Sequence, residues 1–289
     1  MTIERENISM TAEIEVVNLD GISVNLTRHE GKPLIILTRM ASQAMGIWDT
    51  IWADFARYFT VANFDLQGLP GAKRMDAPGE GFRQLAENCV RVAKNLGFEK
   101  FHIFGWNGGT QIAMRCAADY SDRIQSCILL DPFFELADMR KVKKAIEFKR
   151  VLFEHPNREL YAYYWVMAGL SSEFIGNHFD KVEAMVAARM KGDKFVKSDP
   201  DVFIRWVRAL RRNWITDGEF GCIRAPTLVV VTELDNWHAG PSVSMAREVC
   251  DRIPGAELKI IGGFGGHFLV ENPAKFMEIT GPFIRSVAV

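Results

Sequence analysis

One stretch of the 289-residue chain combines a sharp turn with a side chain that the turn would expose. In the stretch from Phe101 to Ala113, a short apolar run rich in β-forming residues stops at a glycine-studded turn that contains Asn107, and an apolar helical pattern begins directly afterwards. This order predicts a strand, a tight turn and a helix, with the Asn107 side chain raised above the end of the strand. A covalent nucleophile at this position needs an oxygen or sulfur that is anionic or can be deprotonated, and the carboxamide of Asn107 is neither.

The elements that would position Asn107 alternate between strands and helices. Strands are expected at residues 14–17, 22–26, 33–37, 61–65, 124–130, 226–231 and 258–261 and at the apolar run that begins at Phe101, and helices at 48–58, 82–96, directly after Gly109, at 242–252 and at 273–285. The first two strands, joined by a tight Asp20-Gly21 turn, predict a hairpin at an antiparallel edge. From residue 33 onward the alternation implies a mostly parallel sheet covered by helices on both faces.

This alternation is interrupted between residues 133 and 222. The interrupting segment has a helical pattern, is rich in arginine, lysine and aromatic residues, and contains no run of comparable strand quality. An insertion of this size between two strands is expected to fold as a helical cap over the carboxyl edge of the sheet, where ligands bind in open α/β sheets. The sequence therefore predicts a core of residues 1–132 and 223–289 and a cap of residues 133–222.

Composition and charge argue against several classes of protein. A formal net charge of −1 removes the usual electrostatic case for nucleic acid or an anionic membrane as the main partner. No run approaches the roughly 20 apolar residues that a membrane span needs. The five cysteines are odd in number and scattered without a C-x-x-C pair, which argues against a disulfide framework or a zinc site and favours a reducing cytoplasm.

The expected partner is a small-molecule substrate. No glycine-rich phosphate loop, flavin signature or metal-ligand cluster is evident in the sequence, so we expect neither a cofactor nor a metal. The sequence leaves the oligomeric state open, with a homodimer as one option.

Several segments in a fixed order resemble the α/β-hydrolase family. They are Pro33 to Leu37 before the oxyanion loop, Asp65-Leu66-Gln67-Gly68 for the D-L-R-G loop, Gly105 to Gly109 for the nucleophile elbow, Pro226 to Val230 before the acid, and Gly265-Gly266-His267-Phe268 for the histidine loop. The resemblance covers nearly the whole chain. It implies the α/β-hydrolase fold, with a mostly parallel eight-stranded sheet, helices on both faces and a helical cap inserted after the sixth strand.

The resemblance also implies roles for three polar residues. Asn107 stands at the nucleophile position, Asp235 is the acid, and His267 is the base that this acid orients. Such a carboxylate fixes the imidazole tautomer and stabilises its protonated form, so that the imidazole can accept a proton near neutral pH. His238 is a rival base and Asp131, at the end of the sixth strand, is a rival acid; we favour His267 and Asp235.

The oxyanion-binding groups are expected around the elbow. Relatives carry His-Gly where this chain has Thr38 and Arg39, and the donor N–H groups are expected from Met40 and Gly108. Arg39 is a candidate for binding an anionic substrate group, and a surface position is the alternative. An apolar, aromatic pocket is expected, with these candidate lining residues: Trp106, Trp165, Trp206, Trp237 and Phe264.

These residues support three hypotheses about function. The favoured one is an enzyme in which His267 and Asp235 form a general base that acts on a small, largely apolar substrate without an acyl-enzyme, as in lyases and cofactor-free oxygenases of the family. The second is an ester, lactone or carbon-halogen hydrolase whose Ser or Asp at position 107 has been replaced, in nature or in the laboratory. The third is a non-catalytic binding protein for small molecules.

Asn107 itself has two further interpretations. The elbow forces a strained backbone, and asparagine tolerates positive φ better than most residues with a Cβ, so Asn107 could be a structural filler. Deamidation of the Asn107-Gly108 pair would instead place an aspartate at the elbow.

Overall fold

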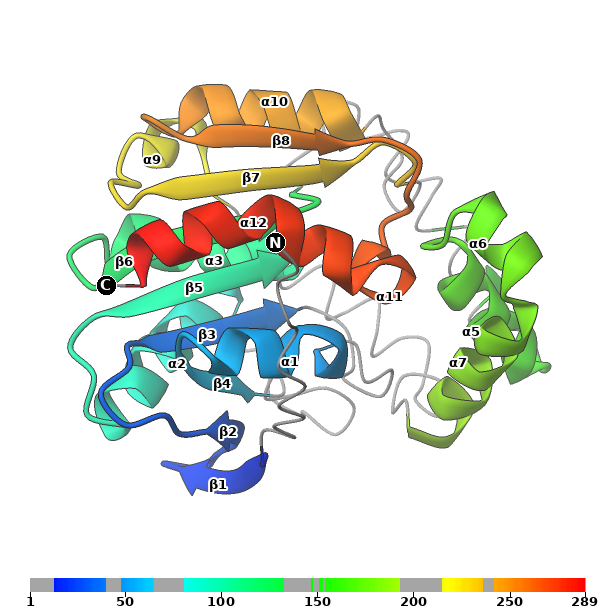
Figure 1. Cartoon of the computed structure of the whole chain (residues 1–289), viewed down its shortest axis with the longest axis horizontal. Helices are drawn as coiled ribbons and strands as arrows, with labels where there is room; N and C mark the ends of the chain where they lie inside the picture. Colours follow the sequence, from blue (N-terminus) through cyan, green and yellow to red (C-terminus); the bar gives the residue numbers. More distant parts are fainter. Residues whose placement is uncertain are drawn as a thin grey trace, which may run out of the picture.

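The computed structural model of the chain describes residues 13–39, 48–64, 81–132, 147, 151–152, 154–192, 215–235 and 242–288. Within these residues an eight-stranded sheet lies between two layers of helices, and a group of further helices stands beyond one end of the strands (Figure 1).

The sheet is antiparallel at one edge and parallel elsewhere. Its strands run in the spatial order β1-β2-β4-β3-β5-β6-β7-β8. They are β1 (Glu15–Leu19), β2 (Ile22–Thr27), β3 (Leu34–Arg39), β4 (Thr60–Phe64), β5 (Phe101–Trp106), β6 (Ile124–Leu130), β7 (Thr227–Thr232) and β8 (Glu257–Ile261). The pairs β1–β2 and β2–β4 are antiparallel and all the others are parallel. The predicted eight-stranded sheet and its antiparallel edge hairpin are confirmed.

Both faces of the sheet are buried, which explains why its central strands are apolar throughout. In β3, Leu34 and Ile36 pack into one core cluster while Ile35 and Leu37 pack into the other. Successive side chains of a strand point to opposite faces, so a strand covered on both sides must be apolar at every position.

The two helical layers divide the helices between these clusters. On one face lie α1 (Asp49–Ala56) and α12 (Pro273–Val287), and on the other lie α2 (Phe82–Asn95), α3 (Gly109–Asp119) and α10 (Ser242–Arg252) (Figure 1). No helix in the described part of the chain combines the length and the apolarity needed to cross a membrane.

Three helices from the predicted cap form a group with its own small core. They are α5 (Arg158–Met167), α6 (Ser172–Asn177) and α7 (Phe179–Gly192), and they face the ends toward which the parallel strands point (Figure 1). The short helix α9 (Asp217–Phe220), within the same predicted range, packs instead against α3 and α10. The extent of the cap, residues 133–222, stays a prediction.

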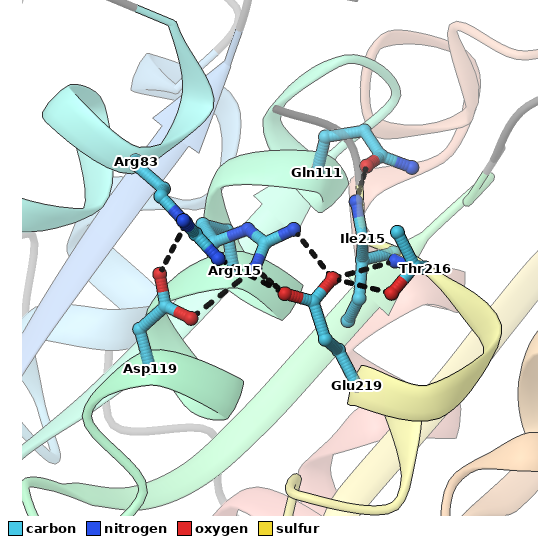
Figure 2. A network of polar contacts seen from close by, with 7 residues as sticks. All are labelled: Arg83, Gln111, Arg115, Asp119, Ile215, Thr216 and Glu219. Atoms are coloured by element: carbon cyan, nitrogen blue, oxygen red, sulfur yellow. Dashed lines mark hydrogen bonds and ion pairs between the residues drawn. The ribbon is translucent and has the colours of Figure 1, made fainter. Parts of the chain in front are cut away.

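A polar network fastens α9 to the helix that follows the elbow (Figure 2). The side chain of Arg115, on α3, is 2% exposed and donates to both carboxylate oxygens of Glu219 at 2.7 and 2.9 Å. Asp119 accepts a hydrogen bond from Arg115 at 3.2 Å. The more exposed Arg83 forms ion pairs with both Asp119 and Glu219. We call these four residues the Arg115 cluster. Because its charges alternate in sign, the cost of burying the Arg115 guanidinium is offset.

Candidate functional site

The elbow lies between β5 and α3, where the sequence predicts it. Asn107 has φ 52°, so the predicted positive φ is confirmed. Its N–H donates to the carbonyl of Leu130 at 2.8 Å, and its carbonyl accepts from the N–H and the hydroxyl of Thr110 at 2.9 and 2.6 Å. The strained conformation is therefore held by backbone bonds on both sides, and asparagine is among the few residues with a Cβ that tolerate it.

Two glycines of the elbow are required by close backbone contacts. A Cβ on Gly105 would lie 2.6 Å from the carbonyl oxygen of Gly109, and a Cβ on Gly109 would lie 2.0 Å from the carbonyl oxygen of Thr38. No side chain fits at either distance. The two glycines of the G-x-N-x-G sequence are therefore needed because the backbone at the start of α3 lies very close to β3 and β5.

The Asn107 side chain turns back onto its own elbow. Its amide oxygen Oδ1 accepts a hydrogen bond from the N–H of Gly108 at 2.8 Å. That N–H is the one expected to bind a substrate oxyanion, so in this conformation the carboxamide takes the place of the oxyanion at Gly108. A substrate oxygen can use the Gly108 N–H only after the Asn107 side chain has rotated.

The Thr38 side chain interacts with the backbone around the elbow. It is buried, and its hydroxyl lies within hydrogen-bonding distance of the carbonyl oxygens of Phe104 and Gly109, at 3.1 and 3.0 Å. This side chain therefore ties β3 to β5 and to the first turn of α3. Several predicted residues lie outside the described part of the chain, namely Met40, the loop at 65–68, Trp206, Trp237 and His238.

His267 is buried at the start of α11 (Phe268–Glu271), with 1% of its surface exposed. Its backbone N–H donates to the carbonyl of Gly169, and its imidazole hydrogen-bonds the backbone of Val166 at the end of α5. Trp106, the residue before Asn107, packs edge-to-face on the imidazole with ring centres 5.8 Å apart. The structure thus brings His267 beside both the elbow and the α5–α7 group.

The environment of His267 favours a neutral imidazole. Its pKa lies well below the ordinary 6.5, mainly because the ring is buried and further because the positive charges of Arg39 and Arg189 are near; the Val166 hydrogen bond opposes this. A neutral imidazole is the form that can accept a proton from a substrate.

Two arginines from different elements are near enough to His267 to affect its pKa. The Arg39 guanidinium, at the end of β3, lies 4.3 Å from the ring centre of Trp106. The Arg189 guanidinium, on α7, is buried and lies 5.5 Å from the ring centre of Trp165, the neighbour of Val166. We call Arg39, Trp106, Arg189 and His267 the histidine site. Arg189 has no local signal in the sequence, because it stands in a basic helical pattern typical of a solvated face.

The two candidate acids are close to each other. Asp131 is 1% exposed, and its Oδ1 accepts from the N–H and the hydroxyl of Thr232 at 2.8 and 2.9 Å. Burial and the negative charge of nearby Asp235 raise the pKa of Asp131 well above its usual range, against the effect of the Thr232 bonds. The raised pKa favours the protonated form of Asp131.

Asp235 lies at the same edge of the sheet as the histidine loop. The neighbouring N–H of Leu234 donates to the carbonyl of Phe264 at 3.1 Å, which fastens the loop after β7 to the segment before His267. Asp235 is 5% exposed. The roles of Asp235 as acid and of Asp131 as its rival stay predictions.

Glu271 fastens the histidine loop to the α5–α6 turn. Its carboxylate accepts from the N–H of Gly265 at 3.0 Å and from the N–H and hydroxyl of Ser171 at 2.8 and 2.5 Å. Ser171 is also the N-cap of α6. Glu271 and Ser171 were not singled out from the sequence: an N-cap serine is a recognisable signal, but its partner 100 residues away is not.

The aromatic residues predicted to line the pocket are largely engaged in packing. The indole N–H of Trp106 donates a hydrogen bond to the carbonyl of Gly266 at 3.0 Å, so this ring helps to hold the histidine loop in place. Trp165 packs between Tyr161 and Tyr164, and Phe264 packs on Phe268. Among the described residues no group of three His, Cys, Asp or Glu side chains is placed to hold a metal ion.

Comparison with known proteins finds hydrolases among the proteins similar to this chain. No family model matches the sequence. A fluoroacetate dehalogenase from Burkholderia sp is 28% identical over 123 residues, which span 41% of this chain and 40% of that protein. A pyrrolizixenacetamide deacetylase from Xenorhabdus hominickii is 24% identical over 263 residues, or 89% of this chain and 92% of that protein.

Solved structures share the overall fold. The enol-lactonase from Burkholderia xenovorans LB400 superposes with a TM-score of 0.72 at 16% identity, covering 94% of this chain and 100% of that one. The curated relatives in these comparisons are hydrolases. The chain has the α/β-hydrolase fold, as the sequence predicts.

Proposed function

We propose that the protein is an α/β-hydrolase-fold enzyme in which His267 acts as a general base on a small, largely apolar substrate without forming an acyl-enzyme. The observation that carries this proposal is the pairing of a buried, neutral imidazole with an elbow that bears a carboxamide. His267 can accept a proton, whereas Asn107 has no oxygen that His267 could deprotonate for attack.

In the proposed reaction a substrate C–H or O–H group transfers its proton to His267. Negative charge then develops on a substrate oxygen, which the amide N–H groups of Asn107 or, after rotation of that side chain, the N–H of Gly108 stabilise. Asp235 is proposed to stabilise the protonated imidazole. Lyase and cofactor-free oxygenase chemistry both begin with such a proton transfer.

The test is loss of product after removal of the imidazole. A panel of cyanohydrins, acidic ketones, lactones and nitrophenyl esters would be screened by mass spectrometry, and the converted compound used for kinetics. His267→Gln should lower kcat/KM at least 100-fold, the scale of general-base catalysis. His178→Gln, in the α6–α7 turn, is the matched control and should keep activity. Unchanged turnover by His267→Gln would end this proposal.

A second candidate is a hydrolase whose nucleophile at position 107 is missing or arises from Asn107 by deamidation. The similarity to a fluoroacetate dehalogenase, a deacetylase and an enol-lactonase supports it. Asn107→Asp should then release halide from 2-haloacids, or Asn107→Ser should hydrolyse nitrophenyl esters. Absence of activity in both variants, together with an intact mass that shows no deamidated fraction, would count against this candidate.

The third candidate is a binding protein without catalysis. The hydrogen bond between Asn107 and Gly108 supports it, because that bond occupies a donor that catalysis of acyl transfer requires. A ligand that binds with no product detected by mass spectrometry would favour this candidate over the other two.

A cytoplasmic location is also proposed, and a homodimer is one option for the oligomeric state. The five cysteines are free thiols, and Cys89, Cys116 and Cys127 are buried, which supports a reducing compartment. Light scattering after size exclusion measures the oligomeric state directly.

A further inference from the structure

His267 is held by the α5–α7 group as well as by its own loop. Val166 lies in the last turn of α5, where the carbonyls of a helix run out of N–H partners within the helix. The hydrogen bond from the Val166 backbone raises the pKa of the imidazole, so the ring donates and the carbonyl accepts. The backbone N–H of His267 donates to the carbonyl of Gly169, three residues further along the chain. One short segment, residues 166–169, therefore holds both the backbone and the ring of this histidine.

The bond to Val166 selects a tautomer of the neutral imidazole. A neutral imidazole has one nitrogen with a hydrogen and one with a lone pair, and a carbonyl oxygen can only accept. The nitrogen that faces Val166 therefore carries the hydrogen, and the other nitrogen is the one that can accept a proton from a substrate. The resemblance to α/β hydrolases implies this task for Asp235, for which the proposed function keeps the stabilisation of the protonated ring.

Glu271 holds the α5–α6 turn against the histidine loop. Its carboxylate accepts from the N–H and the hydroxyl of Ser171 at 2.8 and 2.5 Å and from the N–H of Gly265 at 3.0 Å. Ser171 stands two residues after Gly169, and Gly265 stands two residues before His267. The Glu271 bridge thus lies beside the bond between His267 and Gly169, and hydrogen bonds to a carboxylate are among the stronger ones in proteins.

The turn and the loop are in backbone contact at Gly265. A Cβ on this residue would lie 2.6 Å from the carbonyl oxygen of Gly169 and 2.9 Å from the backbone nitrogen of Ser171. Even an alanine would therefore force the α5–α6 turn away from the histidine loop. The glycine permits the close approach, and Glu271 maintains it.

We propose that Glu271 is a positioning residue for His267: it holds the α5–α6 turn on the histidine loop, so that the Val166 carbonyl stays on the imidazole and one tautomer is kept. This inference rests on the proposed function, because it concerns the base of the same reaction. Glu271 acts through the turn and the loop and takes no part in the proton transfer.

The experiment observes the tautomer by NMR of isotope-labelled histidine nitrogens, whose shifts differ between a nitrogen with a hydrogen and one with a lone pair. At a pH above the ordinary pKa of 6.5, His267 should show one fixed tautomer, its signals identified by their absence in His267→Gln. In Glu271→Gln the two tautomers should interconvert, and both nitrogen shifts should move toward their average. For a compound that is converted, kcat should fall about tenfold with little change in KM, because a misplaced base slows proton transfer more than binding.

Two further variants separate the bridge from a general effect of mutation. Glu278→Gln on α12, where the carboxylate pairs with exposed Lys275, is the matched control and should change neither the tautomer nor kcat. Gly265→Ala keeps Glu271 but pushes the turn away, so it should mix the tautomers as Glu271→Gln does.

A milder variant keeps the test decisive if Glu271→Gln does not fold. Ser171→Ala removes one of the three bonds to the carboxylate and should mix the tautomers to a smaller extent. It also removes the N-cap of α6, so Asn157→Ala, which removes the N-cap of α5, is its control and should keep one tautomer.

A merely structural link would lower the free energy of unfolding and leave the imidazole unchanged. One fixed tautomer in folded Glu271→Gln, or in Ser171→Ala if Glu271→Gln does not fold, would overturn the inference.

The NMR measurement does not depend on turnover. If the tautomers mix in Glu271→Gln while His267→Gln leaves turnover unchanged, the proposed function fails and the effect of Glu271 on the imidazole stands. If His267→Gln abolishes turnover while Glu271→Gln keeps one tautomer, the positioning role fails and the general base stands.

Discussion

Arginines occur in two settings in this protein, and their neighbours differ. In the Arg115 cluster the guanidinium is hydrogen-bonded to carboxylates, and these bonds lower the pKa of Glu219 to about 2 (Figure 2). In the histidine site the guanidiniums of Arg39 and Arg189 stack on indoles and act on a neutral imidazole. The first arrangement stabilises the fold, and the second lowers the pKa of the buried imidazole.

Breaking the Arg115 cluster should give the largest change in stability. Arg115→Met leaves the Glu219 and Asp119 carboxylates without the charge that offsets their burial, so the free energy of unfolding should fall by about 3 kcal/mol. Urea denaturation measures this change in the free energy of unfolding. Arg224→Met, at an exposed arginine bound to Ser121, is the control and should change stability by less than about 0.5 kcal/mol.

The same cluster predicts an acid transition. The pKa of Glu219 is lowered from 4.5 to about 2, so its stabilising effect is complete above pH 4.5 and is lost as the pH falls toward 2. Arg115→Met should lack this part of the acid dependence. If the wild type and Arg115→Met differ in stability by less than about 1 kcal/mol at pH 7, the cluster does not anchor α9.

The two buried histidines should destabilise the fold as the pH falls. Burial lowers the pKa of His102 to about 4, and burial with the two arginine charges lowers that of His267. Both stay neutral in the folded state while the unfolded state is protonated below pH 6.5, so each should lower stability by up to about 1.4 kcal/mol per pH unit in that range. Urea denaturation between pH 7.5 and 4.5 measures this slope, and His102→Asn and His267→Asn should each reduce it. A His267→Asn slope parallel to that of the wild type would contradict the neutral imidazole.

A smaller effect is expected where the histidine loop meets the α5–α6 turn. Glu271→Gln keeps the shape of the side chain but turns one acceptor into a donor against Ser171 or Gly265, so stability should fall by about 1 to 2 kcal/mol. Faster hydrogen exchange at the Gly265 and Ser171 amides would locate the change. Glu278→Gln on α12, whose partner Lys275 is exposed, is the control; equal exchange in both variants would refute the link.

The smallest effect is expected at the rim of the Arg115 cluster. The Arg83 side chain is 56% exposed, so Arg83→Ala should lower the free energy of unfolding by less than about 1 kcal/mol. Thermal and urea denaturation of Arg83→Ala and Arg115→Met, measured side by side, compare the two losses of stability. A loss of stability as large as that of Arg115→Met would show that the difference in burial between Arg83 and Arg115 does not determine how much each contributes to stability.

Much of the fold could be predicted from local patterns. Continuous apolar strands, glycine-rich turns and helical periodicity located the eight strands to within about two residues, because these signals depend on neighbours in the sequence. The same holds for the positive φ of Asn107. Thr38 and Arg39 were expected after the strand, yet they form its last two residues, since the β3–β5 pairing continues to Trp106.

The candidate site was harder to predict because its contacts join distant segments. The charge of Arg189, on α7, affects the pKa of His267, and Glu271 accepts hydrogen bonds from Ser171, 100 residues away in the sequence. Neither contact leaves a periodic or compositional trace. The self-contact of Asn107 with Gly108 depends on a side-chain rotamer, which sequence patterns do not encode.

The bond between Asn107 and Gly108 makes the carboxamide a tethered competitor for any substrate oxygen. Because the competitor is attached to the elbow, it is present at high effective concentration and never diffuses away. An uncharged carbonyl oxygen gains little by replacing it, since one neutral hydrogen bond is exchanged for another. An oxygen that carries full negative charge forms a stronger bond and can displace it, so the elbow would favour intermediates over ground states.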